Sequence, residues 1–524
     1  MLLIFWPIRY KIKSGTCAYK LNSLGGVVNM IKIKDFEFWF ITGSQHLYGP
    51  ETLRQVAEHS NFMVEQLNLD SAIPYKIVFK PIVTRSDEIL KVFIDANSDE
   101  KCAGIITWMH TFSPSKMWIA GFSQLKKPLL HFHTQFNQEI PWNNIDMDFM
   151  NLNQSAHGDR EHGFIGARMR IARKVIAGYW EDASVRERIG AWTRTAVAYI
   201  WGNHLKVARF GDNMRDVAVT EGDKVEAQIK FGWSIDAYSV GDLVDKVNKV
   251  TDEQIDALIS EYGTKYDIVA DAKTGEKYEA IREQARIELG IKAALEEGNF
   301  SAFTTNFEDL HGLKQLPGLA SQDLMGNGYG FGGEGDWKTS AFVNVMKVMS
   351  DNKGTSFMED YTYNLVAGNE MILGSHMLEV CPTIAATKPR IEVHPLGIGG
   401  KSDPARIVFD GASGHAVCAS LIDMGNRFRL IINEVNAEKP TIDMPKLPVA
   451  RVLWKPEPSL QVAAEAWIYA GGAHHTVFSY NVTAEQLIDW AEMAGIEYVL
   501  INNDTTILNL RNELRWSEIA WKLL

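Results

Sequence analysis

The sequence predicts an α/β protein in which two Rossmann-like α/β domains are followed by a mostly β, barrel-like C-terminal domain. Three observations support this expectation. Near the N-terminus, apolar runs that turn polar at their carboxyl ends alternate with segments whose apolar residues recur at helical spacing. The same alternation returns in the middle of the chain. After about residue 352, short alternating runs broken by Gly, Asn and Asp replace it, which is typical of antiparallel β structure.

Residues 1–29 stand apart from the rest of the chain. The charges of MLLIFWPIRYKIK follow its apolar run, the reverse of a signal peptide, and no small-residue cleavage site comes after it. Gly25 and Gly26 precede Met30 at the spacing of a translated ribosome-binding sequence. We therefore predict that Met30 is the natural start and that residues 1–29 are a non-native or disordered extension. N-terminal sequencing of the natively expressed protein tests this, and an intact Met1 refutes it.

The N-terminal domain, residues 30–205, begins with an apolar strand at residues 36–43 and a polar loop. Residues 51–68 then carry apolar side chains at roughly helical spacing, and the apolar runs 102–110 and 128–135 again end in polar residues. Buried parallel strands have this pattern, and ligands of such sheets bind beyond the carboxyl ends of the strands.

The central domain, residues 206–352, repeats the strand–helix pattern. Strands are expected within residues 204–213, 230–241 and 300–310, and amphipathic helices at residues 251–262 and 277–298. No GxGxxG follows a strand in either α/β domain, which argues against a dinucleotide site. The later run PLGIGGK lacks the spacing of a phosphate-binding loop, so no nucleotide site is expected there either.

The C-terminal domain, residues 353–524, is expected to contain antiparallel strands that form a barrel. The runs that predict it lie at residues 390–400, 405–435 and 450–458. A helix at residues 483–495 and a strand at residues 496–502 are expected to close the chain.

The composition limits the class of protein. Hydrophobic residues make up 46% of the 524 residues and charged residues 23%, as in ordinary soluble globular proteins. A net charge of −12 without a basic stripe argues against a nucleic acid or an anionic membrane as partner. Cys17, Cys102, Cys381 and Cys418 show no CxxC spacing and are expected to be free buried thiols in a reducing cytoplasm. No apolar run reaches the roughly 20 residues that span a bilayer.

Two glutamates and two histidines stand at the ends of apolar or Gly-rich runs. They are Glu334 in FGGEGDWK, Glu359 in TSFMEDYTY, His376 in LGSHMLEVCP and His475 in AGGAHHTVF. Two carboxylates and two imidazoles form a mixed oxygen and nitrogen set that suits a divalent Mn, Co, Mg or Zn ion. None of the segments has the short ligand spacing of a zinc finger, so the fold must assemble any such site.

Each of these residues also has a structural interpretation when it is taken alone. Glu334 in its Gly-rich loop is equally typical of a solvated turn. Glu359, among aromatic residues, is typical of either a surface acid or a desolvated acid with a raised pKa. His376 alone indicates a core histidine. His474 and His475 are a stronger signal, because the adjacent glycines allow close approach of the backbone.

These segments closely resemble those of the L-arabinose isomerases, and so do long segments elsewhere. FEFWFITGSQHLYGPETLRQV, at residues 36–56, is the first of them. Others are HTFSPSKMWIAG, HFHTQFNQEIPW, IDMDFMNLNQSAHGDREHGFIGARMR, RFGDNMRDVAVTEGDKVEAQIKFG, FEDLHGLKQLPGLA and NNDTTILNLRNELRW. The resemblance covers nearly all of the chain from about Met30 onward, in one order, which chance similarity does not explain.

The resemblance implies the three-domain fucose-isomerase-like fold and a cytoplasmic aldose–ketose isomerase. The implied reaction converts L-arabinose to L-ribulose, the first step of arabinose catabolism, with side activity from D-galactose to D-tagatose. In that family the positions that match Glu334, Glu359, His376 and His475 are the metal ligands. The expected cofactor is one Mn²⁺ per subunit, for which Co²⁺ or Mg²⁺ are expected substitutes.

The chemistry explains why carboxylates and a cation are needed together. An aldose becomes a ketose when a proton moves from C2 to C1 and the carbonyl shifts. A divalent cation on O1 and O2 polarises the carbonyl and stabilises the enediolate. A carboxylate then carries the proton, best with a pKa near the working pH. We expect Glu334 and Glu359 to be this acid/base pair in addition to binding the metal, and a metal-assisted hydride shift is the rival mechanism.

A second set of residues matches positions that contact sugar in the family. It comprises Gln45, Leu47, Tyr48, Gln154, His157, Met214, Phe307, Phe357 and Ile398. Taken alone, amides such as Gln45 and Gln154 are more often ordinary loop residues, and apolar members are more often core. A pentose needs oriented donors and acceptors beside a partly apolar wall. In the family the N-terminal members reach a neighbouring subunit's site, which implies a homo-oligomer, a hexamer built from trimers.

Several neighbouring residues are given lesser roles. His131 and His133 have a strand spacing that could bind metal but equally places both on one packed face. Asp336 and Asp360 adjoin the expected ligands and are predicted to support them.

Three other functions remain open on the sequence. They are a related ketol-isomerase with another sugar preference such as fucose, a metal-dependent hydrolase with the same donor set, and a non-catalytic sugar-binding protein. Sugar turnover without hydrolysis of esters or phosphates separates them.

Overall fold

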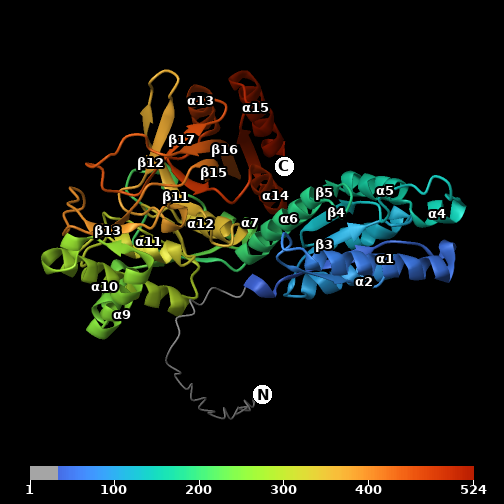
Figure 1. The fold of residues 1–524 in the computed structure, drawn as a ribbon, viewed down its shortest axis with the longest axis horizontal. Coiled ribbons are helices and arrows are strands. Elements are labelled where there is room, and N and C mark those ends of the chain that lie inside the picture. Colours follow the sequence, from blue (N-terminus) through green and yellow to red (C-terminus); the bar gives the residue numbers. More distant parts are fainter. Residues whose placement is uncertain (1–32, 524) are drawn as a thin grey trace, which may run out of the picture.

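The computed structural model describes residues 33–523, in which parallel α/β layers are followed by a strand-rich barrel (Figure 1). The predicted fold class is therefore confirmed. The predicted N-terminal extension, residues 1–29, and Cys17 lie outside the described residues.

The first sheet is parallel throughout and has the strand order β2-β1-β3-β4-β5. Its strands are β1 (Glu37–Thr42), β2 (Lys76–Phe79), β3 (Cys102–Trp108), β4 (Leu129–His133) and β5 (Lys174–Ala177). The strand order reverses direction between β1 and β3, and this switch point is where open α/β sheets bind ligands. The loops after these two strands therefore form a natural binding edge.

Helices cover both faces of this sheet. They are α1 (Gly49–Leu69), α2 (Ser86–Ser98), α3 (Ile119–Phe122), α4 (Met147–Leu152), α5 (Ser155–Arg168) and α6 (Ala183–Gly202), with 3₁₀ turns η1 (Ile33–Asp35), η2 (His46–Tyr48) and η3 (Ser115–Trp118). Helices α1 and α6 pack on one face, together with Phe38 and Phe40, and α2, α3 and α5 pack on the other, together with Trp39 and Ile41. Helix α1 begins with Pro50 in its first turn and buries a stripe that includes Met63 and Leu67. Helix α6 also contacts the later helices α12 and α14, so it joins this layer to the rest of the molecule.

The second sheet is also parallel, with the order β10-β9-β6-β7. Its strands are β6 (Lys206–Phe210), β7 (Ser234–Tyr238), β9 (Ala302–Thr305) and β10 (Gly330–Gly332). The accompanying helices are α7 (Lys224–Phe231), α8 (Val240–Asn248), α9 (Asp252–Lys265), α10 (Gly275–Gly298), α11 (Gly318–Gly326) and α12 (Trp337–Met349), with η4 (Ala218–Thr220) and η5 (Ala270–Ala272). Helix α12 is buried along its whole length because it lies between this sheet and the barrel.

The third sheet closes into a barrel. Its order is β15-β18-β11-β12-β17-β16-β19, and an additional pairing of β15 with β16 completes a ring. The strands are β11 (Thr355–Asn364), β12 (Met371–Ser375), β15 (Gly414–Asp423), β16 (Phe428–Glu438), β17 (Arg451–Pro456), β18 (His475–Ser479) and β19 (Glu497–Ile501). Ring neighbours are antiparallel, whereas β19 joins the first half of β16 in parallel. Closure leaves few free strand edges.

A small sheet ties the barrel to the central layer. It has the order β14-β13-β8 and consists of β8 (Asp267–Ile268), β13 (Arg390–Val393) and β14 (Ala405–Val408). The 3₁₀ turn η6 (Pro382–Ile384) precedes β13 in the chain and contacts α11 and β11. The remaining helices are α13 (Leu460–Ala470), α14 (Ala484–Ala494) and α15 (Ile507–Leu523). The predicted helix 483–495 and strand 496–502 correspond to α14 and β19, but the expectation that they close the chain is wrong, since α15 follows. Within residues 33–523, no helix has both the length and the apolar character that crossing a membrane requires.

Candidate metal centre and sugar site

Glu334 lies in the loop between β10 and α12, and its backbone is left-handed with φ of 62°. A non-glycine residue takes this conformation only where its surroundings hold it there. Next to it, Gly335 has φ of 80°, and a Cβ there would lie 2.6 Å from the backbone of Asn213. The Gly-rich sequence thus permits the tight turn that brings the Glu334 carboxylate within 3.7 Å of His475 on the barrel.

The other three residues come from adjacent barrel strands. Glu359 on β11 is the direct antiparallel partner of His475 on β18 and of Ser375 on β12. His376 follows Ser375 immediately, so strand register alone brings these side chains together. Phe357 shares the Glu359 face of β11, and its ring makes edge contacts with both imidazoles at centroid distances of 5.0 and 5.1 Å.

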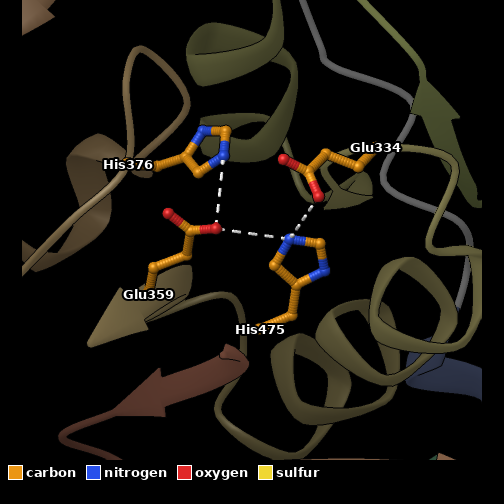
Figure 2. A group of neighbouring side chains, drawn as sticks. All are labelled: Glu334, Glu359, His376 and His475. Carbon is orange, nitrogen blue, oxygen red and sulfur yellow. Dashed lines mark ion pairs between the residues drawn. The ribbon is translucent and has the colours of Figure 1, made fainter. Parts of the chain in front are cut away.

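Figure 2 shows the four side chains converging on one point. One donor atom from each lies within 4.8 Å of the others. His475 Nε2 is 3.4 Å from Glu359 Oε1 and 3.7 Å from Glu334 Oε2, and His376 Nε2 is 3.8 Å from Glu359 Oε1. Both imidazoles are buried and both carboxylates are nearly so. The four predicted metal ligands are therefore brought together from distant parts of the sequence.

Two further carboxylates orient the imidazoles. His475 Nδ1 is 2.9 Å from Asp336 Oδ2, and His376 Nδ1 is 2.5 Å from Glu379 Oε2. Because both Nδ1 atoms are engaged, both Nε2 atoms face the cluster, and His475 Nε2 is buried without a hydrogen-bond partner. Carboxylate–histidine pairs of this kind are usual behind metal-binding imidazoles. The donor set and the unpartnered nitrogen fit a divalent cation.

The charges of the cluster are mutually dependent. Burial opposes the charge on His475, but its hydrogen bond to Asp336 and the nearby Glu359 carboxylate raise its pKa to about 9. Burial likewise opposes ionisation of Asp336 and Glu359, yet Lys338 and His475 hold the pKa of Asp336 well below its usual range, and His475 lowers that of Glu359. Asp336 and Glu359 thus stay ionised because cationic groups lie beside them.

A cavity adjoins the cluster. It is lined by Thr305, Phe307, Leu310, Leu316, Pro317, Phe331, Gly333, Glu334, His376, Met377, Leu378 and Glu379. Phe307, predicted to form an apolar wall, is among them. The backbone N–H of Met214 donates to the Glu334 carbonyl at 2.9 Å, which places that predicted residue at the edge of the site. Ile398 is 42% exposed and is absent from this lining, although a Cβ at the adjacent Gly399 would lie 3.4 Å from Leu316.

The remaining predicted sugar residues lie elsewhere in the same chain. Gln45, Leu47, Tyr48, Gln154 and His157 gather at the carboxyl edge of the first sheet, and none of them lines the cavity. Tyr48 Oη donates to Gln154 Oε1 at 3.3 Å. Leu47 is 83% exposed, so this edge presents an apolar side chain to the exterior. The predicted sugar-contact residues are therefore divided between two separate places in one chain.

Sequence reasoning missed some contacts and misplaced one. Glu379 was not singled out, although a carboxylate three residues after His376 is a usable signal. His474, which the sequence indicated together with His475, places Nε2 3.7 Å from Glu334 Oε2. Asp360 faces away from the cluster and lines a separate cavity between barrel strands and α13, so its predicted supporting role is wrong. Strand alternation from Glu359 explains this.

The two discounted histidines on β4 have a structural partner. His131 and His133 both contact the buried carboxylate of Asp159, at 2.8 and 2.7 Å. Strand alternation indeed puts both on one packed face, where Asp159 satisfies them. The cysteines Cys102, Cys381 and Cys418 are buried free thiols, as predicted.

Comparison with known proteins finds three family models that match consecutive parts of the chain between residues 32 and 497. Residues 32–204 match the L-arabinose isomerase N-terminal domain, residues 206–352 the central domain and residues 354–497 the C-terminal domain. Curated relatives include the L-arabinose isomerase of Geobacillus thermodenitrificans, 67% identical over 494 residues that cover 94% of this chain and 100% of the relative. Those of Clostridium beijerinckii and Bacillus subtilis are 64% and 61% identical, with the same coverage.

Proposed function

Because the chain belongs to the L-arabinose isomerase family and is thus an aldose–ketose isomerase, we propose that it converts L-arabinose to L-ribulose by proton transfer at Glu334 and Glu359. The observation that carries the proposal is the convergence of two carboxylates and two inward-facing imidazole nitrogens beside a cavity. In the proposed role this is the first step of arabinose catabolism in the cytoplasm, with D-galactose to D-tagatose as side activity.

Glu334, Glu359, His376 and His475 would hold one Mn²⁺, for which Co²⁺ or Mg²⁺ could substitute. When bound, such a cation supplies Lewis-acid polarisation of the sugar carbonyl. Asp336 and Glu379 fix the imidazole tautomers, so that the neutral Nε2 atoms are the ones presented to the cation.

The two glutamates divide the proton transfers. One carboxylate accepts the C2 proton and returns it to C1, while the other handles the hydroxyl proton that moves between O1 and O2. Phe307 and Phe357 exclude water from one side of the site, which limits loss of the carried proton to solvent. Substrate deuterated at C2 distinguishes this from a hydride shift, because solvent hydrogen at C1 of the product excludes a pure hydride shift.

The division of the predicted sugar-contact residues supports a shared site in an oligomer, which we propose to be a hexamer of two trimers. In this arrangement Gln45, Tyr48 and Gln154 of one subunit complete the sugar site beside the metal cluster of another. Co-expression of Glu334→Gln and Gln154→Ala subunits tests it. Mixed oligomers regain activity that neither variant has alone if sites are shared, and they stay inactive if each chain forms its own site.

The deciding experiment is ketose formation from L-arabinose by chelator-stripped protein, before and after addition of Mn²⁺. The proposal expects activity only with metal. Absence of ketose with any divalent metal, from protein that is folded and oligomeric, contradicts it, and a panel of other aldoses then becomes the next measurement.

A further inference from the structure

Lys338 is a buried cation in the first turn of α12, only 1% exposed. Its ammonium group donates to the carbonyl oxygens of Val219, Thr220 and Glu221 at 3.0, 3.0 and 2.6 Å. Because an ammonium has three N–H groups, these contacts satisfy it completely. A buried charge is tolerated only where its N–H groups find acceptors. Lys338 therefore holds the segment 219–221 against the start of α12.

Lys338 also lies beside the carboxylate that orients a predicted ligand. Its Nζ is 3.3 Å from Asp336 Oδ1. The other oxygen, Asp336 Oδ2, contacts His475 Nδ1 at 2.9 Å and accepts from Thr339 Oγ1 at 2.7 Å. The Asp336 carboxylate is therefore held between a fixed cation and the imidazole, with a helix N-terminus behind it.

The segment that Lys338 fastens reaches a second predicted ligand. Asn213 Nδ2 donates to the carbonyls of Thr220 and Gly335 at 2.5 and 3.2 Å. The next residue, Met214, donates its backbone N–H to the Glu334 carbonyl at 2.9 Å. The left-handed backbone at Glu334 is thus supported from the same segment, although Lys338 touches neither Glu334 nor His475.

We propose that Lys338 is a positioning residue that sets the aim of His475, through Asp336, and of Glu334, through residues 213–221. Both ligands then present their donor atoms to one cation without rearrangement, which raises the metal affinity. This inference rests on the metal site of the proposed function and assigns a role to a residue outside the ligand set.

Lys347 provides a matched control on the same helix. It is 2% exposed, and its ammonium donates to Asn352 Oδ1, the Thr355 carbonyl and Cys381 Sγ at 3.1, 3.1 and 3.3 Å. Lys338→Met and Lys347→Met each remove one buried cation with three acceptors. A purely structural role therefore predicts similar losses of thermal stability and equal metal binding in the two variants.

The test is calorimetric titration of metal-free protein with Mn²⁺, together with the visible absorption spectrum of the Co²⁺ form. For Lys338→Met we expect affinity weakened by about tenfold or more and an altered Co²⁺ spectrum, whereas Lys347→Met stays within about twofold of the wild type. Equal affinity and identical spectra in the two variants overturn the inference. If the wild type itself binds no Mn²⁺, the proposed function fails first, so the two failures are distinguishable.

A measurement on the unaltered protein covers the case in which Lys338→Met does not fold. Mn²⁺ binding should slow amide hydrogen exchange in residues 218–222, which contain no ligand. Unchanged exchange there, while exchange around Glu359 slows, overturns the coupling.

Discussion

Two buried clusters of acidic residues in this molecule differ in whether their own neighbours satisfy them. At the candidate metal centre, Glu334 and Glu359 face two imidazoles, and His475 Nε2 has no hydrogen-bond partner. In the central α/β layer, Glu288 on α10 and Asp323 on α11 are buried even more completely, at 1% and 0% exposure. Burial and acidity alone therefore do not separate the two clusters.

The partners of the central cluster are all provided by the fold. Tyr262 donates to Glu288 and Tyr266 donates to Asp323. Lys265 Nζ lies 3.1 Å from Asp323 Oδ2. With no inward-facing unpartnered atom, this cluster has nothing to offer a cation. An unsatisfied donor atom, more than a concentration of acid, therefore indicates a metal site.

The largest effect on activity is expected from substitutions in the metal-centre cluster, whereas a substitution in the central cluster should have little effect. Glu334→Gln and Glu359→Gln should each lower kcat by about 10²–10⁴-fold, because each removes a proton carrier and a ligand charge. Glu288→Gln should stay close to the wild-type rate. The measurement is ketose formation from L-arabinose with excess Mn²⁺, with the exposed Glu370→Gln as control. Rates near that of the wild type in both site variants contradict the assignment.

Stabilisation of the protein by Mn²⁺ should depend on the metal-centre cluster and not on the central cluster. Mn²⁺ at about 100 times its Kd should stabilise the metal-free protein by about 2.7 kcal/mol, measured as a rise in Tm. The rise should disappear in Glu334→Gln and persist in Glu288→Gln. If the Mn²⁺-induced rise in Tm persists in Glu334→Gln but disappears in Glu288→Gln, the metal binds at the central cluster and the prediction is contradicted.

Glu379 gives a smaller effect at the first cluster. Glu379→Gln leaves the ligands in place but weakens the contact that orients His376, so Mn²⁺ affinity should fall about 10- to 100-fold. Titration of metal-free protein measures this, and turnover at saturating Mn²⁺ should recover most of the wild-type value. Unchanged affinity indicates that His376 is oriented by packing alone.

The smallest effect concerns pH and the second cluster. Burial, with Asp323 nearby, raises the pKa of Glu288 well above 4.5. Below pH 4.5 the Glu288 side chain is neutral in both the folded and the unfolded protein. Above pH 4.5 it ionises in the unfolded chain first, because its pKa is higher in the folded protein. The free energy of unfolding of the wild type therefore falls as pH rises toward the folded-state pKa. Glutamine cannot ionise, so Glu288→Gln should gain relative stability across that window, by at most about 1.4 kcal/mol per pH unit. Denaturant titrations at several pH values check this, and a pH-independent difference contradicts it.

Much of the fold could be predicted because local patterns carry it. The apolar runs at 36–43, 102–110 and 128–135 became parallel strands, and the Gly-broken runs after residue 352 became the barrel. Several helices were not predicted, among them α2, α6, α12, α13 and α15. Helix α15 has a single fully buried residue, Leu510, so its periodic signal is weak. The proposed domain limits at residues 205 and 352 stay predictions.

The site was predictable as a list of residues but not as an arrangement. Family resemblance identified Glu334, Glu359, His376 and His475 together, while no spacing in the sequence reveals that Glu359 and His475 are strand partners. Asp360 was misassigned because adjacency in sequence was weighed above strand alternation. Lys338 was not singled out, since its role depends on carbonyl groups more than 100 residues away.

The pairing of β11 with β18 also orders events during synthesis of the chain. A ribosome delivers Glu334, Glu359 and His376 well before His475, and the ring of strands cannot close until β18 has emerged. A nascent or prematurely terminated chain that ends before β18 therefore has three of the four donors and an open sheet edge. If the four donors hold a cation as proposed, its tight binding comes late in biosynthesis and distinguishes finished chains from unfinished ones.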